Sequence, residues 1–202
     1  MARFQLRFEG DPILRKKARP VTKIDDKIRK TLDDMVETMR QESGIGLAAP
    51  QIGRLRRMVV IDVGDGVYQM INPELQGASE EMEEDIEGCL SLLHFNGTVN
   101  RPKWVELSYL DRQGEKKELR AEGLFARCIC HELDHLDGIL FRDRVIREIS
   151  LDHPSPEDLA YIQSHCPHKE EGEEAETDGS EGGEEGQAPA SENRDEQEEA
   201  LS

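Results

Sequence analysis

Long apolar runs are missing from this chain of 202 residues. It contains no run of about 18 apolar residues, the least that a membrane-spanning helix needs. No apolar core of about 7–15 residues follows the N-terminal Met1-Ala2-Arg3-Phe4, as it would in a secretory signal. We therefore expect a soluble, cytoplasmic protein with no membrane partner.

Cysteine is scarce, and several functional fingerprints are absent. Four cysteines without a secretory signal do not favour disulfides. No GxGxxG pattern follows a strand, which argues against a dinucleotide site. No PCxxC motif is present, which argues against a zinc nucleobase deaminase. The chain also shows no internal repeat.

Basic residues are outnumbered, and the imbalance is concentrated at one end. The net charge is −18, of which residues 169–202 carry −12 through 14 acidic and 2 basic residues. This segment has no aromatic residue and cannot bury enough apolar surface to offset the entropy of ordering. We expect one domain over residues 1–168 and a disordered tail over 169–202. The tail is repelled by nucleic-acid phosphate, and no DNA partner is expected.

The most informative segment present is His131-Glu132-Leu133-Asp134-His135. On a helix, residues i and i+4 lie on one face, so two imidazoles can hold one metal ion while Glu132 handles protons for a water molecule. No proline interrupts residues 122–136, and Gly138 stands where a helix C-cap falls. The pattern indicates metal-assisted hydrolysis. A buried helix with two ordinary histidines is the alternative.

A third protein ligand is needed to complete such a site. The longer HExxHxxGxxH pattern is absent, although His153, His165, His168 and Glu157 follow downstream. Cys89, in the segment Glu87–Leu92, is the better candidate because a thiolate binds zinc or iron(II) strongly. A small buried cysteine is the simpler interpretation of Cys89 taken alone.

A run of small residues, Gly44–Gly53, forms the third informative segment. Small residues allow close backbone approach, and the Gln51 amide can donate to an oxyanion. A glycine-rich turn before a strand is the alternative interpretation.

Together, GIGLAAPQIG, EGCLS and HELDHLDG, in this order over Gly44–Gly53, Glu87–Ser91 and His131–Gly138, resemble peptide deformylase. The resemblance covers roughly residues 4–165. It departs from the family after EGCLS, where Leu92–Asn96 replaces the usual proline and glycine. In that segment we expect His94 to lie in a solvated loop rather than to bind metal.

The resemblance implies a role for each matching position. Cys89, His131 and His135 would be the metal ligands, and Glu132 the general acid and base. Gln51 and the Leu90 backbone N–H would stabilise the oxyanion, and Glu87 and Arg101 would form a structural ion pair. The candidate substrate-binding residues are Ile45, Gly46, Leu124 and Cys128. Cys130 is expected to be an ordinary packed cysteine, which is also the simpler interpretation of Cys128.

The implied reaction is hydrolysis of the formyl group of N-formylmethionyl nascent peptides, with release of formate. The implied cofactor is one divalent metal ion per chain, Fe²⁺ in many members, with Zn²⁺, Ni²⁺ or Co²⁺ able to substitute. The implied partners are nascent peptides and, transiently, the ribosome. A metallopeptidase of another type and a non-enzymatic binding module remain as alternatives. The first would cut unformylated peptides, and the second would lack a ligand or the acid/base residue.

Hydrophobic patterning predicts an α+β fold. Apolar spacing predicts an N-terminal amphipathic helix at about Asp26–Gln41, and Ser155-Pro156 begins a short final helix. Strands are predicted at 57–63, 67–72, 103–110 and 115–120. With the resemblance, we expect mainly antiparallel sheets packed around a central metal-binding HExxH helix.

Overall fold

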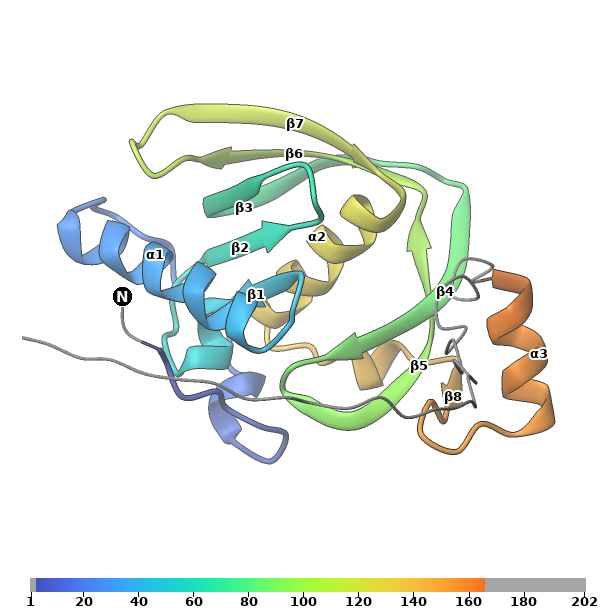
Figure 1. Ribbon diagram of the computed structural model, residues 1–202. Helices are drawn as coiled ribbons and strands as arrows, with labels where there is room; N and C mark the ends of the chain where they lie inside the picture. The colour runs from blue at the N-terminus through green and yellow to red at the C-terminus, as the bar shows by residue number, and fades with distance from the viewer. Residues whose placement is uncertain (1–2, 166–202) are drawn as a thin grey trace, which may run out of the picture. The chain divides into compact units, whose positions relative to one another are not determined.

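The computed structural model describes residues 3–165, in which two antiparallel sheets surround a central helix (Figure 1). In chain order the elements are η1 (Pro12–Arg15), α1 (Asp26–Gln41), β1 (Gly46–Ala48), η2 (Ala49–Ile52), β2 (Met58–Asp62), β3 (Val67–Ala78), β4 (Met82–Cys89), β5 (Leu92–Pro102), β6 (Trp104–Leu110), β7 (Lys116–Glu122), α2 (Gly123–Leu136), η3 (Phe141–Arg144), β8 (Arg147–Ile149) and α3 (Pro156–His165). The fold is α+β, as predicted.

One sheet has five strands in the order β1-β2-β3-β6-β7, and the other has three in the order β4-β5-β8. Every neighbouring pair in both sheets is antiparallel. β1 lies at one edge of the larger sheet and pairs only with β2. The strands β4 and β5 curve past the open end of the larger sheet (Figure 1).

Helix α1 occupies the predicted range, Asp26–Gln41. It begins there because the Asp25 carboxylate accepts hydrogen bonds from the backbone N–H groups of Lys27 and Ile28, both at 3.1 Å. Its apolar face packs against β2. The buried apolar residues of this face are Leu32, Met35, Val36 and Met39.

Helix α2 is the centre of the fold. Every residue from Ala126 to Leu136 is buried, which is unusual for a helix carrying charged side chains. The helix ends as predicted, because Gly138 adopts a left-handed φ of 76° and the N–H of Ile139 returns to the carbonyl of Asp134 at 2.9 Å. An added Cβ at Gly138 would lie 2.6 Å from the Arg15 carbonyl oxygen, so a larger residue at this position would also clash with the backbone.

The smaller sheet differs from the sequence predictions. β4 and β5 were not predicted as strands, and β3 continues six residues beyond the predicted end at Asn72, to Ala78. His94 is exposed, as expected, but it lies within β5 with a left-handed φ of 58° rather than in a loop. The nearest paired residues of β5 are Leu92, opposite Cys89, and Asn96, opposite Gly88, so His94 lies in the irregular stretch between them.

No helix within residues 3–165 is long and apolar enough to cross a membrane. The predictions for the acidic segment 169–202 and for His168 concern residues outside those that the structure describes.

Candidate metal centre and its cavity

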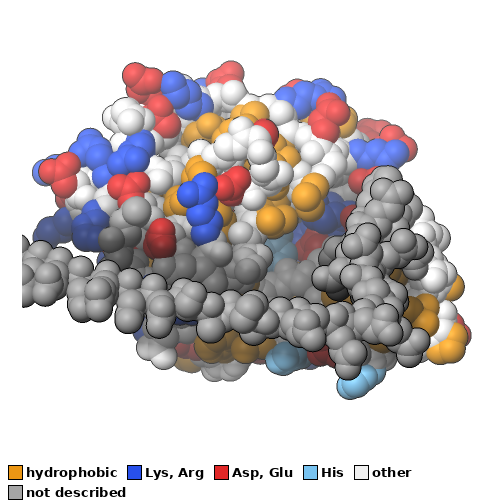
Figure 2. Space-filling model, in the orientation of Figure 1, with side chains coloured by type: hydrophobic (Ala, Val, Ile, Leu, Met, Phe, Trp, Pro, Cys, Tyr) orange, Lys and Arg blue, Asp and Glu red, His pale blue; other side chains and the backbone are white. Residues whose placement is uncertain are grey.

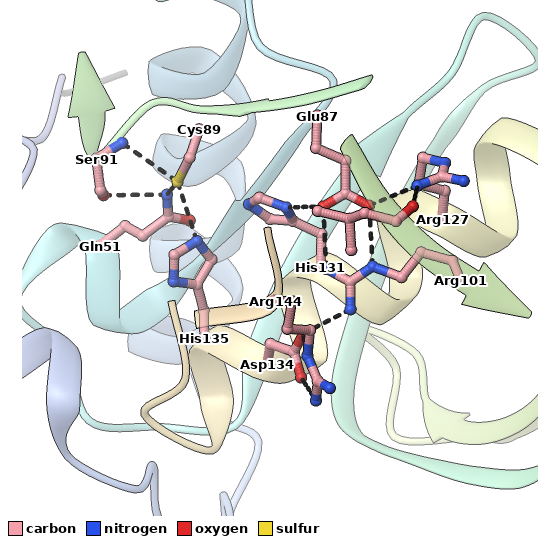
Figure 3. Close-up of polar contacts among 11 residues, drawn as sticks. Gln51, Glu87, Cys89, Ser91, Arg101, Arg127, His131, Asp134, His135 and Arg144 are labelled. Atoms are coloured by element: carbon pink, nitrogen blue, oxygen red, sulfur yellow. Dashed lines mark hydrogen bonds and ion pairs between the residues drawn. The ribbon is translucent and has the colours of Figure 1, made fainter. Parts of the chain in front are cut away.

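Three predicted metal ligands meet at one point. His131 and His135 project from the same face of α2, with ring centroids 5.0 Å apart, and Cys89 lies opposite them at the end of β4. The Cys89 Sγ atom is 3.2 Å from His135 Nε2, and the ligand atoms of all three side chains lie within 4.8 Å of one another. Figure 3 shows Cys89 and His135 facing each other across the gap between strand and helix.

A register shift in the smaller sheet places Cys89. Gly88 pairs with Asn96, whereas Cys89 pairs with Leu92, so the strand is irregular where the thiol turns toward α2. The backbone N–H of Ser91 donates to Cys89 Sγ at 3.4 Å. The cysteine is therefore positioned by strand pairing and by the turn that follows it.

The three side chains suit a transition-metal ion by chemistry as well as by distance. Thiolate and imidazole are the donors that zinc and iron(II) take in proteins, and three protein ligands leave one position open. His131 Nδ1 contacts Glu87 Oε2 at 3.0 Å, the outer contact that usually orients a ligating histidine. Among residues 3–165, His153 and His165 are not part of the cluster.

Glu87 is the hub of a buried ion network. Arg101 donates to both of its carboxylate oxygens, at 2.9 and 3.0 Å, which confirms the expected Glu87–Arg101 pair. Arg127 donates to Oε1 at 2.9 Å. Burial alone would raise the pKa of Glu87, but the hydrogen bonds with His131 and Arg101 outweigh it and lower the pKa to about 2. Glu87 therefore stays ionised and holds His131 in one orientation.

Asp134 extends this network along α2. Its Oδ2 atom accepts from Arg101 at 2.6 Å and from Arg144 at 2.5 Å. Both carboxylates that contact Arg101 are buried, and so is the Arg101 side chain, at 4% exposed. The network joins β4, β5, η3 and α2 through charge-assisted hydrogen bonds (Figure 3).

Gln51 is fixed with its amide nitrogen toward Cys89, one of the predicted metal ligands. Its Oε1 atom accepts from the backbone N–H of Ala48 at 2.7 Å. Its Nε2 atom donates to Ser91 Oγ at 3.1 Å and lies 3.7 Å from Cys89 Sγ. Since the side chain is buried, its NH₂ group has a defined direction.

Glu132 is buried beside the cluster, at 3% exposed. Its Oε2 atom has no hydrogen-bond partner within residues 3–165. Burial raises the pKa of Glu132 to about 7, although the neighbouring His131 acts in the opposite direction. Gly46 is necessary here, because a Cβ at that position would lie 2.5 Å from Glu132 Oε1 and 2.7 Å from Cys128 Sγ.

A cavity of about 370 Å³ opens onto these groups. Its lining includes all four predicted substrate-binding residues, Ile45, Gly46, Leu124 and Cys128, together with Gln51, Cys89, Leu90, His131 and Glu132. Ile45 and Leu124 are exposed at 43% and 55%, so apolar side chains stand at the cavity's edge. Figure 2 shows hydrophobic side chains gathered on the face between the larger sheet and β4.

Cys128 and Cys130 differ in surroundings. Cys128 lines the cavity, with Sγ 3.7 Å from the Ile45 carbonyl oxygen, whereas Cys130 lies outside the lining. Burial, reinforced by the Glu132 carboxylate, raises the pKa of the Cys128 thiol well above its usual value, so it remains protonated. At about 100° per residue, two cysteines separated by one residue on a helix point about 200° apart, which accounts for their different surroundings.

The sequence predicted no role in the centre for four residues that contribute to it, namely Ser91, Arg127, Asp134 and Arg144. Three of them act through long-range contacts that no local pattern reveals. Asp134 stood inside the HELDH segment, and a carboxylate on the buried side of a helix is a usable signal that it has cationic partners.

A family model described as polypeptide deformylase matches residues 5–150. The chain belongs to the polypeptide deformylase family. The resemblance carried by GIGLAAPQIG, EGCLS and HELDHLDG is thus confirmed. Members of this family are metalloenzymes, and the cluster of Cys89, His131 and His135 can hold a metal ion.

Relatives and solved structures of the same family are similar along nearly their whole length. A peptide deformylase of Caldanaerobacter subterraneus subsp. tengcongensis is 54% identical over 148 residues, covering 73% of this chain and 92% of the relative. One from Alkaliphilus metalliredigens is 51% identical over 143 residues, covering 71% and 97%.

The crystal structure of peptide deformylase from Thermotoga maritima superposes with a TM-score of 0.71 at 43% identity, covering 72% of this chain and 99% of that one. The Synechococcus elongatus enzyme, solved in complex with actinonin, gives a TM-score of 0.69 at 40% identity, covering 80% and 84%.

Proposed function

We propose that this chain hydrolyses the N-terminal formyl group of formylmethionyl polypeptides and releases formate, the reaction of its family. The observation that carries the proposal is the meeting of Cys89, His131 and His135 at the cavity beside Glu132. An amide hydrolase needs a polarised carbonyl, an activated water molecule and a group that moves protons. This chain offers residues for each task.

We assign the metal to Cys89 Sγ and to one ring nitrogen of each histidine. When bound, a divalent ion supplies Lewis acidity toward the formyl oxygen and toward water. We propose iron(II) as the native ion, following the family resemblance, with zinc, nickel or cobalt able to occupy the same donors. All four ions accept a thiolate and two imidazoles, so the ligand set alone does not select among them.

Glu132 is the proposed general acid and base. Its unpartnered Oε2 atom can accept a proton from the attacking water and later deliver it to the departing amine. A pKa of about 7 suits both transfers near neutral pH, because a group that must gain and lose a proton works best when its pKa is close to the ambient pH.

Gln51 and the Leu90 backbone N–H are the proposed oxyanion donors. Gln51 is suited to this role because Ala48 and Ser91 hold its amide so that the NH₂ group faces Cys89. A donor fixed before the reaction stabilises developing negative charge without reorganising.

The peptide would bind along β1. This strand is at the sheet edge. Gly46 at its start and Ile45 just before it line the cavity, so backbone groups there can pair with an extended peptide. Leu124 and Cys128 also line the cavity and would contact the methionine side chain of the substrate. We also infer a cytoplasmic location and a transient encounter with the ribosome, because nascent formylmethionyl chains arise there.

The test is formate release from a formyl-Met-Ala-Ser peptide by protein loaded anaerobically with iron(II). Wild type should release formate and Cys89→Ala should not, while Cys130→Ala, outside the cavity, should behave as wild type. Cleavage of unformylated peptides without formate release would instead identify a different metallopeptidase. A metal-loaded protein that hydrolyses neither peptide would point to a binding module.

A further inference from the structure

A second hollow in the domain is lined by three arginines. It measures about 340 Å³ and lies outside the metal centre and its cavity. Its lining consists of Arg19, Arg54 and Arg56 with Ile28, Thr31, Leu55 and Met58. We refer to it as the arginine hollow.

The backbone brings these arginines together from distant segments. Arg19 and Arg56 form an isolated parallel bridge, in which the Arg19 N–H donates to the Leu55 carbonyl at 3.2 Å and the Arg57 N–H donates to the Arg19 carbonyl at 2.9 Å. Arg54 follows Gly53, whose left-handed φ of 76° ends η2. The guanidinium groups therefore project from a hydrogen-bonded framework rather than from a free loop.

The charge of the arginine hollow is uncompensated. Arg19, Arg54 and Arg56 are all exposed, and within residues 3–165 none of their side chains forms an ion pair or hydrogen bond with a carboxylate. Arg54 instead packs over the Phe4 ring, 5.1 Å from its centroid. By contrast, Arg57 next to them is paired with Asp137 at 2.8 Å.

This exception is notable in a chain with a net charge of −18. Acidic residues are abundant enough to neutralise most surface arginines, yet within the described part of the chain these three have no acidic partner. Like charges held together destabilise the free protein unless an anion joins them. Grouped unpaired arginines are therefore the electrostatic footprint of an anionic partner.

We propose that the arginine hollow binds the phosphate backbone of RNA. The planar guanidinium group of arginine donates two parallel hydrogen bonds to a phosphate. Several neighbouring arginines can therefore bind successive phosphates of one strand. The hollow contains none of the exposed large apolar side chains that insertion into a lipid surface requires. An enzyme of this charge needs a local basic surface to approach RNA at all.

The choice of RNA rests on the proposed function, because formylated nascent chains emerge from a particle rich in RNA. The acidic segment 169–202 cannot supply the attraction, since its charge of −12 is repelled by phosphate. The arginine hollow offers the attraction from the catalytic domain itself.

The test compares the full-length protein with two triple variants of equal charge change. Arg19→Gln/Arg54→Gln/Arg56→Gln removes the hollow's cations, and Lys116→Gln/Lys117→Gln/Arg120→Gln removes three exposed cations of β7 that are paired with acids. Binding to a labelled RNA hairpin is measured by fluorescence anisotropy over a salt series. Relative to wild type, the slope of log K against log salt should become shallower by about 2–3 in the first variant, as expected for three lost phosphate contacts, and change little in the second.

Equal slopes and affinities in wild type and the hollow variant would overturn the proposal, as would absence of RNA binding by wild type at low salt. Arginine-dependent binding to phosphatidylglycerol vesicles without RNA binding would overturn it in favour of a membrane surface. Formate release from the free formyl peptide, measured on the same samples, should be equal in all three proteins. Its absence in wild type would refute the proposed function without bearing on the RNA result.

Discussion

Helix α2 and the strand pair β4–β5 contribute to the same metal centre by different means. The helix places His131 and His135 through its own repeat, since residues four apart share a face whatever surrounds them. Cys89 has no such local rule and depends on the register of β4 against β5 and on the Ser91 N–H. One half of the centre, on α2, is therefore determined by the local helix repeat. The other half, on β4, is determined by the pairing of β4 with β5.

The buried ion network connects the two halves. Glu87 of β4 contacts His131 of α2, and Arg101 of β5 contacts both Glu87 and Asp134 of α2. A substitution confined to the helix, such as one at Glu132, should lower kcat with little effect on metal binding or stability. Substitutions in the ion network should affect both the activity and the stability of the centre.

The largest effect is expected from Glu132→Gln, a change within the helix half. The substitution keeps the shape of the side chain and leaves the three proposed ligand side chains in place, but it removes the proposed proton carrier. We expect kcat to fall by about 10²–10⁴-fold while one metal ion per chain is retained. Formate release and metal analysis on the same sample check this. Near-native turnover would reject the role assigned to Glu132.

Arg101→Ala, which cuts the connection between the halves, should have the next largest effect. It leaves Glu87 and Asp134 buried without their shared partner, at a cost of about 3–5 kcal/mol in the free energy of unfolding. Metal affinity should also fall by about 10–100-fold, because Glu87, which contacts and orients His131, would no longer be held by Arg101.

Arg144→Ala is the matched control for Arg101→Ala. Its side chain is 44% exposed and Asp134 keeps Arg101, so a loss of about 1 kcal/mol or less is expected. Urea unfolding and competitive metal titration give both quantities. Equal losses for the two variants would show that Arg101 does not link the halves.

The same contrast explains what the sequence could and could not predict. The bounds of α1 and the end of α2 follow from local signals, namely apolar spacing, the Asp25 cap and Gly138. β4 was missed because Met82 is followed by three consecutive acidic residues and the segment lacks alternation. Its strand form comes from pairing with β5. The ligand set and Gln51 were predicted from motifs, but the contacts of Ser91, Arg127 and Arg144 required the fold.

The smallest effect is expected outside both halves, from Thr38→Val in α1. The Thr38 hydroxyl accepts from the Phe4 N–H at 3.0 Å and donates to the Asp34 carbonyl at 2.7 Å, and it is fully buried. Removing it should cost about 1 kcal/mol in the free energy of unfolding and leave kcat and metal affinity unchanged. Loss of metal in this variant would mean that α1 also supports the centre.

We propose that β4 and α2 together hold the metal through Cys89, His131 and His135. The most direct measurement is the absorption spectrum of the cobalt(II)-substituted protein, in which a bound thiolate gives a charge-transfer band. We expect this band in wild type and in Cys128→Ala, and we expect it to be absent in Cys89→Ala. A band that persists in Cys89→Ala, or that disappears in Cys128→Ala, would contradict the assignment of Cys89 as the thiolate ligand.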